Sequence, residues 1–253
     1  MRRWVAALAV GALAVGTASC GEDAGGEGER LVVSAAASLT EPLTACGDDF
    51  DGARVRLSFA GSDELAAQIR QGFEPDVFAA ANTELPETLA RAGLLRRSSV
   101  FATNELVVAV PAGSDIRGVE DLARDKVTVV AGGPSVPVGS STRDLLGRLD
   151  PSTERAIVAN IRSEEPDVKG VVGKVLQGAA DAGFAYASDV AAAEARLKAI
   201  RLPERLQPEV AYGAGVVAGA RNFEDAQRYV DGLRRGPCAD ALRDAGFRPP
   251  PGA

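Results

Sequence analysis

Histidine is absent from this chain of 253 residues. Its absence excludes a Ser-His-Asp or Cys-His nucleophilic site and any zinc site built on histidine. Cysteine is scarce as well: Cys20, Cys46 and Cys238 stand far apart in the sequence, so a thiolate metal cluster is not expected. We therefore expect a protein that is not an enzyme and has no cofactor.

Basic residues are in the minority. Lys and Arg total 28 against 35 Asp and Glu, which gives a formal net charge of -7. No basic stripe occurs, so nucleic acid is not expected as a partner. An acidic protein that binds an anion has to hold it with local dipoles, because its net charge repels the ligand.

Residues 1–20 have the pattern of an export signal. A positively charged start (residues 1–3) precedes an apolar run (residues 4–16) that is too short to span a bilayer well and ends in small residues. The segment before Cys20 resembles a bacterial lipobox, which implies that Cys20 is lipidated and anchors the protein to the outer face of the cytoplasmic membrane. The alternative is a secreted protein in which Cys20 is incidental. Residues 21–30, mostly Gly and Glu, are expected to form a flexible tether.

The remaining chain alternates short apolar runs with amphipathic stretches. Strands are expected at residues 31–33, 55–59, 76–79, 106–110, 127–130, 156–158, 182–186, 197–202 and 210–217. Helices are expected at residues 39–50, 65–71, 83–92, 142–149, 168–177, 223–234 and 238–245. Alternation of this kind indicates an α/β protein with parallel sheets and right-handed crossovers.

Two apolar strands, 106–110 and 210–217, bracket an independent second set of these units. A chain that leaves one lobe, builds another and returns needs two such crossing strands. We therefore expect two lobes, each a mainly parallel sheet flanked by helices, with a ligand cleft between them. Residues 31–107 and 213–253 would form lobe I, and residues 108–212 lobe II.

Four turns between a strand and a helix contain small or polar residues and almost no cations. They hold Ser38, Ser62, the loop 132–142 around Val138, and Val168 after Asp167. In open α/β sheets, ligands bind beyond the carboxyl ends of the strands, where helix N-termini present free N–H groups. Either serine, taken alone, is equally explained as a helix cap.

Tyr186 ends the apolar strand 182–186, so its hydroxyl could reach the cleft; a core-edge tyrosine bonded to backbone is the alternative. Together with the four turns it describes a pocket of hydroxyls, backbone amides and a phenol. Such a lining donates hydrogen bonds and contains no cation.

Short motifs occur in order along the chain: residues 33–40 (VSAAASLT), 59–62 (FAGS), 75–78 (PDVF), 104–108 (NELVV), 136–139 (VPVG), 167–170 (DVKG) and 186–189 (YASD). This set resembles the periplasmic molybdate-binding proteins of ABC importers along nearly the whole mature chain. The resemblance implies a two-lobed, type II periplasmic-binding-protein fold that closes on molybdate or tungstate. Its partners would be a membrane permease with its ATPase, and we expect the binding protein itself to be a monomer.

The resemblance also implies the ligand contacts. Molybdate would be held through its oxygens, without direct ligation of the metal, by Ser38, Ser62, Val138, Val168 and Tyr186. The two valines would contribute only their backbone amides. Some relatives carry a serine where this chain has Asp63. Because a carboxylate in the cleft would repel a dianion, we expect Asp63 to face away and support its helix start.

The donor-only lining favours an oxyanion that is fully deprotonated at neutral pH, such as molybdate or tungstate, over monoprotonated phosphate, which also needs an acceptor. Size separates molybdate from sulfate. The alternatives are the same fold binding sulfate, phosphate or a small organic anion, an enzyme on a two-lobed scaffold, and a structural lipoprotein without a ligand.

If Cys20 carries lipid, Cys46 and Cys238 remain as an even pair in an exported chain, where disulfides persist. Both lie in the lobe that contains the chain's ends, so a disulfide between them is expected. Two separately buried thiols are the alternative.

Overall fold

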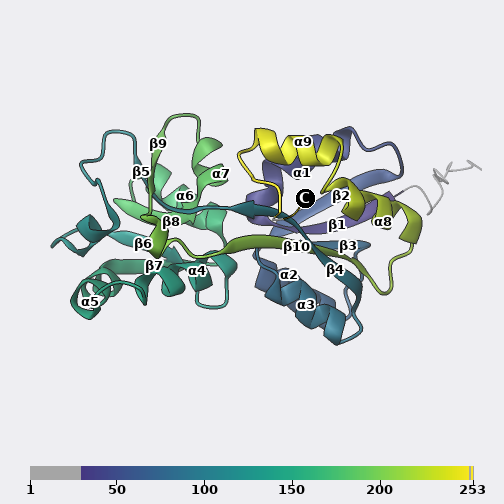
Figure 1. Cartoon of the computed structure of the whole chain (residues 1–253), viewed down its shortest axis with the longest axis horizontal. Helices are drawn as coiled ribbons and strands as arrows, with labels where there is room; N and C mark the ends of the chain where they lie inside the picture. The colour runs from purple at the N-terminus through teal and green to yellow at the C-terminus, as the bar shows by residue number, and fades with distance from the viewer. Residues whose placement is uncertain (1–29, 251, 253) are drawn as a thin grey trace, which may run out of the picture.

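The computed structural model describes residues 30–250 and 252 of the chain. Two lobes lie side by side along the long axis of the molecule (Figure 1). Each lobe is built on one five-stranded sheet with helices on both faces. The expected two-lobed α/β fold is confirmed.

Lobe I contains both ends of the described chain. Its sheet has the order β2 (Arg54–Ala60), β1 (Arg30–Ala36), β3 (Val77–Ala80), β10 (Val210–Val217) and β4 (Leu95–Asn104). One face carries α1 (Thr40–Asp48), α8 (Phe223–Gly232) and α9 (Pro237–Asp244), and the other carries α2 (Ser62–Arg70) and α3 (Glu84–Arg91) (Figure 1). A short 3-10 helix, η1 (Ala37–Leu39), joins β1 to α1.

Lobe II repeats this plan. Its sheet has the order β7 (Ile161–Glu165), β6 (Val129–Gly132), β8 (Ala182–Tyr186), β5 (Leu106–Pro111) and β9 (Leu197–Arg201). The helices α6 (Val168–Leu176) and α7 (Ala187–Ala191) lie on one face, and α4 (Pro137–Leu146) and α5 (Pro151–Asn160) lie on the other (Figure 1). The 3-10 helices η2 (Val119–Ala123) and η3 (Glu204–Leu206) complete its connections.

Both sheets are mainly parallel, as expected, with one antiparallel strand in each. In lobe I, β1 is parallel to β2 and β3, whereas β10 is antiparallel to β3 and β4. In lobe II, β6 is parallel to β7 and β8, whereas β5 is antiparallel to β8 and β9. The two antiparallel strands are those that follow a passage between lobes. Each enters its sheet from the side of the cleft, so it runs against the strands that end there.

The chain passes between the lobes at the ends of strands. The chain leaves the first sheet at Asn104 and enters the second at Leu106, and it returns at Val210. The expected boundaries, 107–108 and 212–213, therefore lie inside β5 and β10 rather than between the sheets.

The strand expected at 156–158 is wrong, because these residues belong to α5. The start of this helix is fixed locally. Asp150 is the N-cap, its carboxylate accepting from the N–H groups of Ser152 and Thr153, and Pro151 occupies the first helical position. These signals at the helix start outweigh three apolar residues, of which only Ile157 is fully buried.

Two strands were not expected from the sequence, β4 and β7. Both are edge strands, and both carry polar residues over much of their length. An edge strand buries less side-chain surface, so its apolar pattern is weak. The helix expected from residue 142 also begins earlier, at Pro137.

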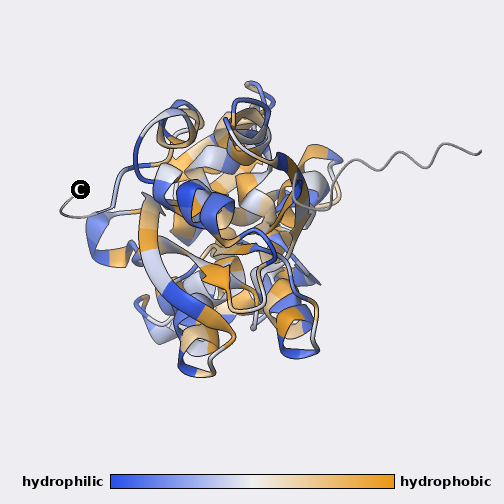
Figure 2. Ribbon diagram, turned by 90° about the vertical axis from the view of Figure 1, so that its right-hand side faces the viewer, coloured by the Kyte–Doolittle hydropathy of each residue, from blue (hydrophilic) through white to orange (hydrophobic). Residues whose placement is uncertain are grey.

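Lobe I is closed by a disulfide between Cys46 of α1 and Cys238 of α9, whose Cα atoms lie 4.6 Å apart. This is the pair expected from the sequence. The helices show alternating hydrophobic and hydrophilic stripes (Figure 2), as expected for helices that bury one face against a sheet. Within residues 30–250 and 252, no helix is both long and apolar enough to cross a bilayer.

Candidate functional site

All five residues proposed to contact the ligand line one small pocket between the lobes. Lobe I contributes the turns after β1 and β2, and lobe II contributes the starts of α4 and α6 and the end of β8. The lining residues are Ala36, Ala37, Ser38, Ala60, Gly61, Ser62, Ala81, Val136, Pro137, Val138, Asp167, Val168 and Tyr186. The free volume is about 10 Å³, roughly that of one water molecule by the same measure. The pocket is therefore small, and the serine, valine and tyrosine side chains that line it are buried.

Neither serine caps its helix. Ser38 lies within η1 and Ser62 is the first residue of α2, and no side-chain cap is formed at either start. Ser62 Oγ accepts a hydrogen bond from the backbone N–H of Ala81 at 3.1 Å. Ser38 Oγ lies 2.9 Å from the hydroxyl of Tyr212, which belongs to β10. Both serine side chains are thus buried at the pocket with their oxygens already in contact with a protein group.

The two valines stand at helix starts of lobe II. Val168 is the first residue of α6, and Val138 is the second residue of α4, after Pro137. N–H groups at these positions have no partner within their own helix, and the helix dipole makes them favourable for an anion. Asp167 also lines the pocket, but its carboxylate is used as the N-cap of α6, accepting from the N–H of Gly170 at 2.8 Å.

Tyr186 closes the pocket from lobe II. Its side chain is buried, and its hydroxyl makes no hydrogen bond of normal geometry with the described residues. Burial raises the pKa of this phenol far above its usual range, with Asp189 adding to the effect, so the group keeps its proton. A buried hydroxyl without a partner favours a ligand that accepts its hydrogen bond.

The lobes are in direct contact around the pocket. A Cβ added to Gly61 of lobe I would overlap the carbonyl oxygen of Pro166 in lobe II, so only glycine permits this approach. Beside it, Ser135 Oγ of lobe II donates to Asp63 Oδ2 of lobe I at 2.7 Å. Lys169 of α6 reaches back to lobe I in the same way. The structure is therefore the closed form of the cleft.

Asp63 was expected to face away from the cleft. It does not line the pocket, but its carboxylate points across to the other lobe instead of only supporting its own helix. The hydrogen bond from Ser135 fixes it there. The carboxylate thus contributes to closure without forming part of the pocket wall.

The cation closest in sequence to the pocket residues is already paired. Lys169 Nζ lies 2.7 and 2.8 Å from the two carboxylate oxygens of Glu41 and 3.3 Å from Asp189 Oδ1. Burial raises the pKa of Asp189 to about 6, while Lys169 acts in the opposite direction. The lysine charge is shared between these carboxylates and is not directed at the pocket.

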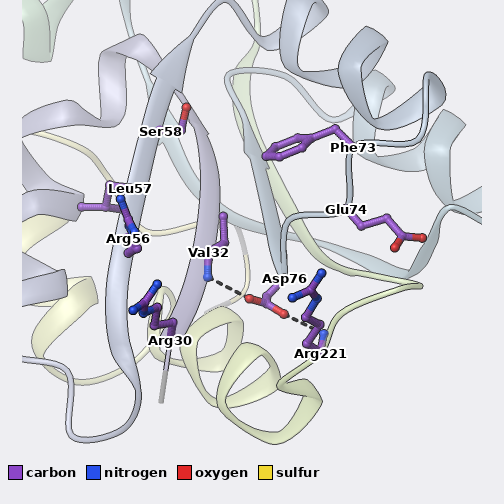
Figure 3. Close-up of a pocket in the computed structure, with 9 residues that line it drawn as sticks. All are labelled: Arg30, Val32, Arg56, Leu57, Ser58, Phe73, Glu74, Asp76 and Arg221. Atoms are coloured by element: carbon purple, nitrogen blue, oxygen red, sulfur yellow. Dashed lines mark hydrogen bonds between the residues drawn. The ribbon is translucent and has the colours of Figure 1, made fainter. Parts of the chain in front are cut away.

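A roomier hollow lies elsewhere on lobe I, with a free volume of about 530 Å³ (Figure 3). We call it the arginine hollow, after Arg30, Arg56 and Arg221, and Phe73 forms part of its wall. Asp76 in its floor is a structural group, because its carboxylate accepts from the backbone N–H groups of Val32 and Arg221. The hollow stands at the starting ends of β1 and β2, opposite to the ends at which such sheets bind ligands.

Several contacts at the pocket had no signal in the sequence. Tyr212 lies in an apolar crossing strand, and the pairs Asp63–Ser135 and Glu41–Lys169 join residues far apart in the chain. For the contact between the lobes, the sequence offered one local hint, Gly61, because a glycine before a helix permits close approach of another segment.

Comparison with known proteins places the chain in a family. The model of the bacterial extracellular solute-binding proteins matches residues 31–248. The chain belongs to this family. Among its relatives, the molybdate-binding protein ModA of Mycobacterium tuberculosis H37Rv is 37% identical over 227 residues, covering 87% of this chain and 85% of the relative. The ModA of Escherichia coli K12 is 27% identical over 262 residues, covering 97% and 98%.

Solved structures of other solute-binding proteins share the fold. The periplasmic molybdate-binding protein of Azotobacter vinelandii has a TM-score of 0.78 at 21% identity, covering 87% of this chain and 99% of that one. The substrate-binding domain of a putative molybdenum ABC transporter from Clostridium difficile has a TM-score of 0.67 at 26% identity, covering 87% and 99%. The resemblance to periplasmic molybdate-binding proteins seen in the sequence is confirmed.

Proposed function

We propose that this solute-binding protein captures molybdate or tungstate outside the cytoplasm and delivers it to the permease of an ABC importer. The observation that carries the proposal is the small pocket of buried residues between the lobes. It is lined by hydroxyl, phenol and helix-start amide donors from both lobes, and no lysine or arginine lines it. The relatives named for molybdate binding support the same ligand.

The chemistry of the lining matches a dianion that carries no proton. We assign the hydroxyls of Ser38 and Ser62, the amides of Val138 and Val168, and the phenol of Tyr186 as donors to the ligand oxygens. Hydrogen bonds to a charged group contribute about 1.5–3 kcal/mol each. Several together can replace the water that the dianion loses on entering a closed site.

Closure explains how binding is coupled to delivery. Donors from lobe I and lobe II can reach one ligand only when the lobes meet, as they do at Gly61 and at the Asp63–Ser135 hydrogen bond. The bound anion therefore favours the closed form, and a permease that recognises this form would receive the loaded protein.

The anchor and the remaining assignments extend the proposal. Residues 1–20 and 21–30 would serve as signal peptide and tether, with Cys20 lipidated; residues 1–29 lie outside the described part of the chain. The protein would act as a monomer without catalysis, together with the permease and its ATPase. Loss of the protein from the membrane fraction after Cys20→Ala would support the anchor, whereas unchanged fractionation would contradict it.

A panel of oxyanions tests the ligand. We expect molybdate and tungstate to raise the melting temperature of the purified protein and to bind in isothermal titration calorimetry, with sulfate and phosphate much weaker. Protein purified from medium supplemented with molybdate should carry about one molybdenum atom per chain by elemental analysis. A shift with sulfate or phosphate but not with molybdate would overturn the assignment.

A further inference from the structure

Tyr212 connects the two halves of the pocket but does not line it. It lies in β10, the strand by which the chain returns to lobe I, and its side chain is fully buried. Its ring contacts the ring of Tyr186 edge to face, with the centroids 5.9 Å apart, and its hydroxyl lies 2.9 Å from Ser38 Oγ. The residue therefore touches one pocket group from each lobe.

Buried groups surround the contact between Tyr212 and Ser38. Asn104 Oδ1 accepts from the backbone N–H of Glu105 at 2.9 Å, and Asn104 Nδ2 donates to Ser188 Oγ at 2.8 Å. The amide nitrogen of Asn104 is thus the end directed into the interior. Burial raises the pKa of Tyr212 well above its usual value, while the hydrogen-bonding groups of Ser38 and Asn104 act in the opposite direction. The phenol therefore remains protonated and has a proton that it can donate to Ser38.

We propose that Tyr212 is a positioning residue that donates its hydrogen bond to Ser38 Oγ, so that the Ser38 hydroxyl can only donate into the pocket. The inference rests on the proposed function and deepens it. A serine hydroxyl has one proton and can also accept. Once Tyr212 donates to Ser38 Oγ, the proton of the Ser38 hydroxyl is available for a hydrogen bond to the ligand.

The second serine is arranged in the same way by a different group. Ser62 Oγ accepts from the backbone N–H of Ala81 at 3.1 Å, which leaves its proton for the ligand. Both hydroxyls are therefore set as donors before the ligand arrives. A ligand oxygen that carries a proton finds no acceptor at either serine, so the arrangement selects fully deprotonated oxyanions.

Tyr212→Phe tests the inference, because it removes the hydroxyl and keeps the ring contacts with Phe101, Tyr186 and Phe247. We expect molybdate to bind about tenfold more weakly in calorimetry. Inorganic phosphate should lose less, since the released Ser38 hydroxyl can then accept from a protonated ligand, so the molybdate-to-phosphate affinity ratio should fall. Tyr229→Phe is the matched control: its hydroxyl is also buried, has no hydrogen-bond partner among the described residues, and does not line the pocket.

A double-mutant cycle separates positioning from a general loss of stability. If Tyr212 acts through Ser38, then adding Tyr212→Phe to Ser38→Ala should change molybdate affinity by less than about twofold. Losses that multiply in the double variant, or a Tyr212→Phe protein that binds as tightly as wild type, would overturn the inference alone. A wild-type protein that binds no oxyanion would overturn the proposed function as well.

Discussion

The pocket between the lobes and the arginine hollow differ in a way that runs against simple expectation for an anion-binding protein. The arginine hollow is roomy and carries three exposed arginines, of which none forms an ion pair within the described residues. The pocket is small, its lining is mostly buried, and no lysine or arginine of the described residues lines it. Yet the pocket, and not the arginine hollow, is the proposed oxyanion site.

Enclosure and orientation account for the difference. In the pocket, amides at helix starts and buried hydroxyls come together from two lobes, and burial would strengthen the hydrogen bonds proposed to a bound anion. In the arginine hollow, the charges face solvent, where water and salt screen them. The comparison indicates that a protein with net charge -7 can hold an anion through directed dipoles.

The largest effect is expected from preventing enclosure. Gly61→Ala places a methyl group against the carbonyl oxygen of Pro166, while the backbone angles of Gly61 (φ -58°, ψ 135°) suit alanine. The lobes should fold normally but fail to meet, and molybdate affinity should fall by about 100-fold or more. Calorimetry measures the affinity, and small-angle scattering should show that molybdate no longer compacts the variant.

Gly113→Ala is the control for that experiment, because a Cβ at this position meets nothing within 4 Å. It should bind as wild type does. A Gly61→Ala protein that keeps wild-type affinity would show that the closed contact is unnecessary and would remove enclosure from the explanation.

The next effect isolates one directed dipole. Val168→Pro removes the amide proposed to face the ligand, at a helix position that tolerates proline. The preceding residue, Asp167, already has the extended angles that a following proline requires (φ -158°, ψ 175°). Loss of one charge-assisted bond should cost about 1.5–3 kcal/mol, or roughly 10- to 150-fold in affinity. Val168→Ala keeps the amide and should bind nearly as wild type; equal affinity in both variants would exclude this amide as a ligand contact.

Much of the pocket could be predicted from the sequence because its parts are local. Four of its residues follow a strand and stand at the start of a helix or 3-10 helix: Ser38, Ser62, Val138 and Val168. In each lobe, such positions lie at the edge of the sheet where the parallel strands end. The family resemblance then assigned their roles. The disulfide could be predicted because the lipobox assigned one of the three cysteines to lipid, which left two cysteines to pair.

What could not be predicted is long-range or weakly patterned. Tyr212 and Ser38 meet only because β10 returns to lobe I beside β3, and no local pattern encodes that pairing. The edge strand β7 exposes alternate residues and lacks an apolar face, and the run 156–158 looked like a strand until the cap at Asp150 was considered. The direction of the Asp63 side chain could not be predicted either. It was expected to turn away from the cleft, but its hydrogen-bond partner, Ser135, belongs to the other lobe.

The third prediction concerns the charge of the buried carboxyl group of Asp189 and its effect on stability. The pKa of Asp189 is raised to about 6 in the folded protein, above its ordinary 3.8, so its ionisation opposes folding as the pH rises through this interval. Asp189→Asn, which mimics the neutral form beside Lys169, should therefore be more stable than wild type by up to about 3 kcal/mol at pH 7.5. The advantage should fall to about half by pH 5. Urea unfolding at the two pH values measures it, and an advantage independent of pH would mean that Asp189 is not the titrating group.

Removing one hydroxyl at a time should have a moderate effect. Ser38→Ala and Ser62→Ala each lose a side-chain donor and keep their backbone amide, so each should weaken molybdate binding by about tenfold. Neither serine caps a helix, so little loss of helix stability is expected. Calorimetry beside thermal unfolding separates the two quantities; unchanged affinity in both variants would move the ligand elsewhere.

The smallest effect on molybdate affinity is expected from removing the charges of the arginine hollow. Arg30 and the pocket residue Ala36 stand at opposite ends of β1, and Arg56 and the pocket residue Ala60 are four residues apart on β2, which gives a separation of roughly 13 to 20 Å along the strands. This exceeds the Debye length of about 8 Å at physiological salt. A triple variant, Arg30→Gln with Arg56→Gln and Arg221→Gln, should therefore keep its molybdate affinity within about twofold, although the protein becomes more acidic. A tenfold loss at physiological salt, with an unchanged melting temperature, would show that the arginines contribute to capture, and the distinction between the two hollows would fail.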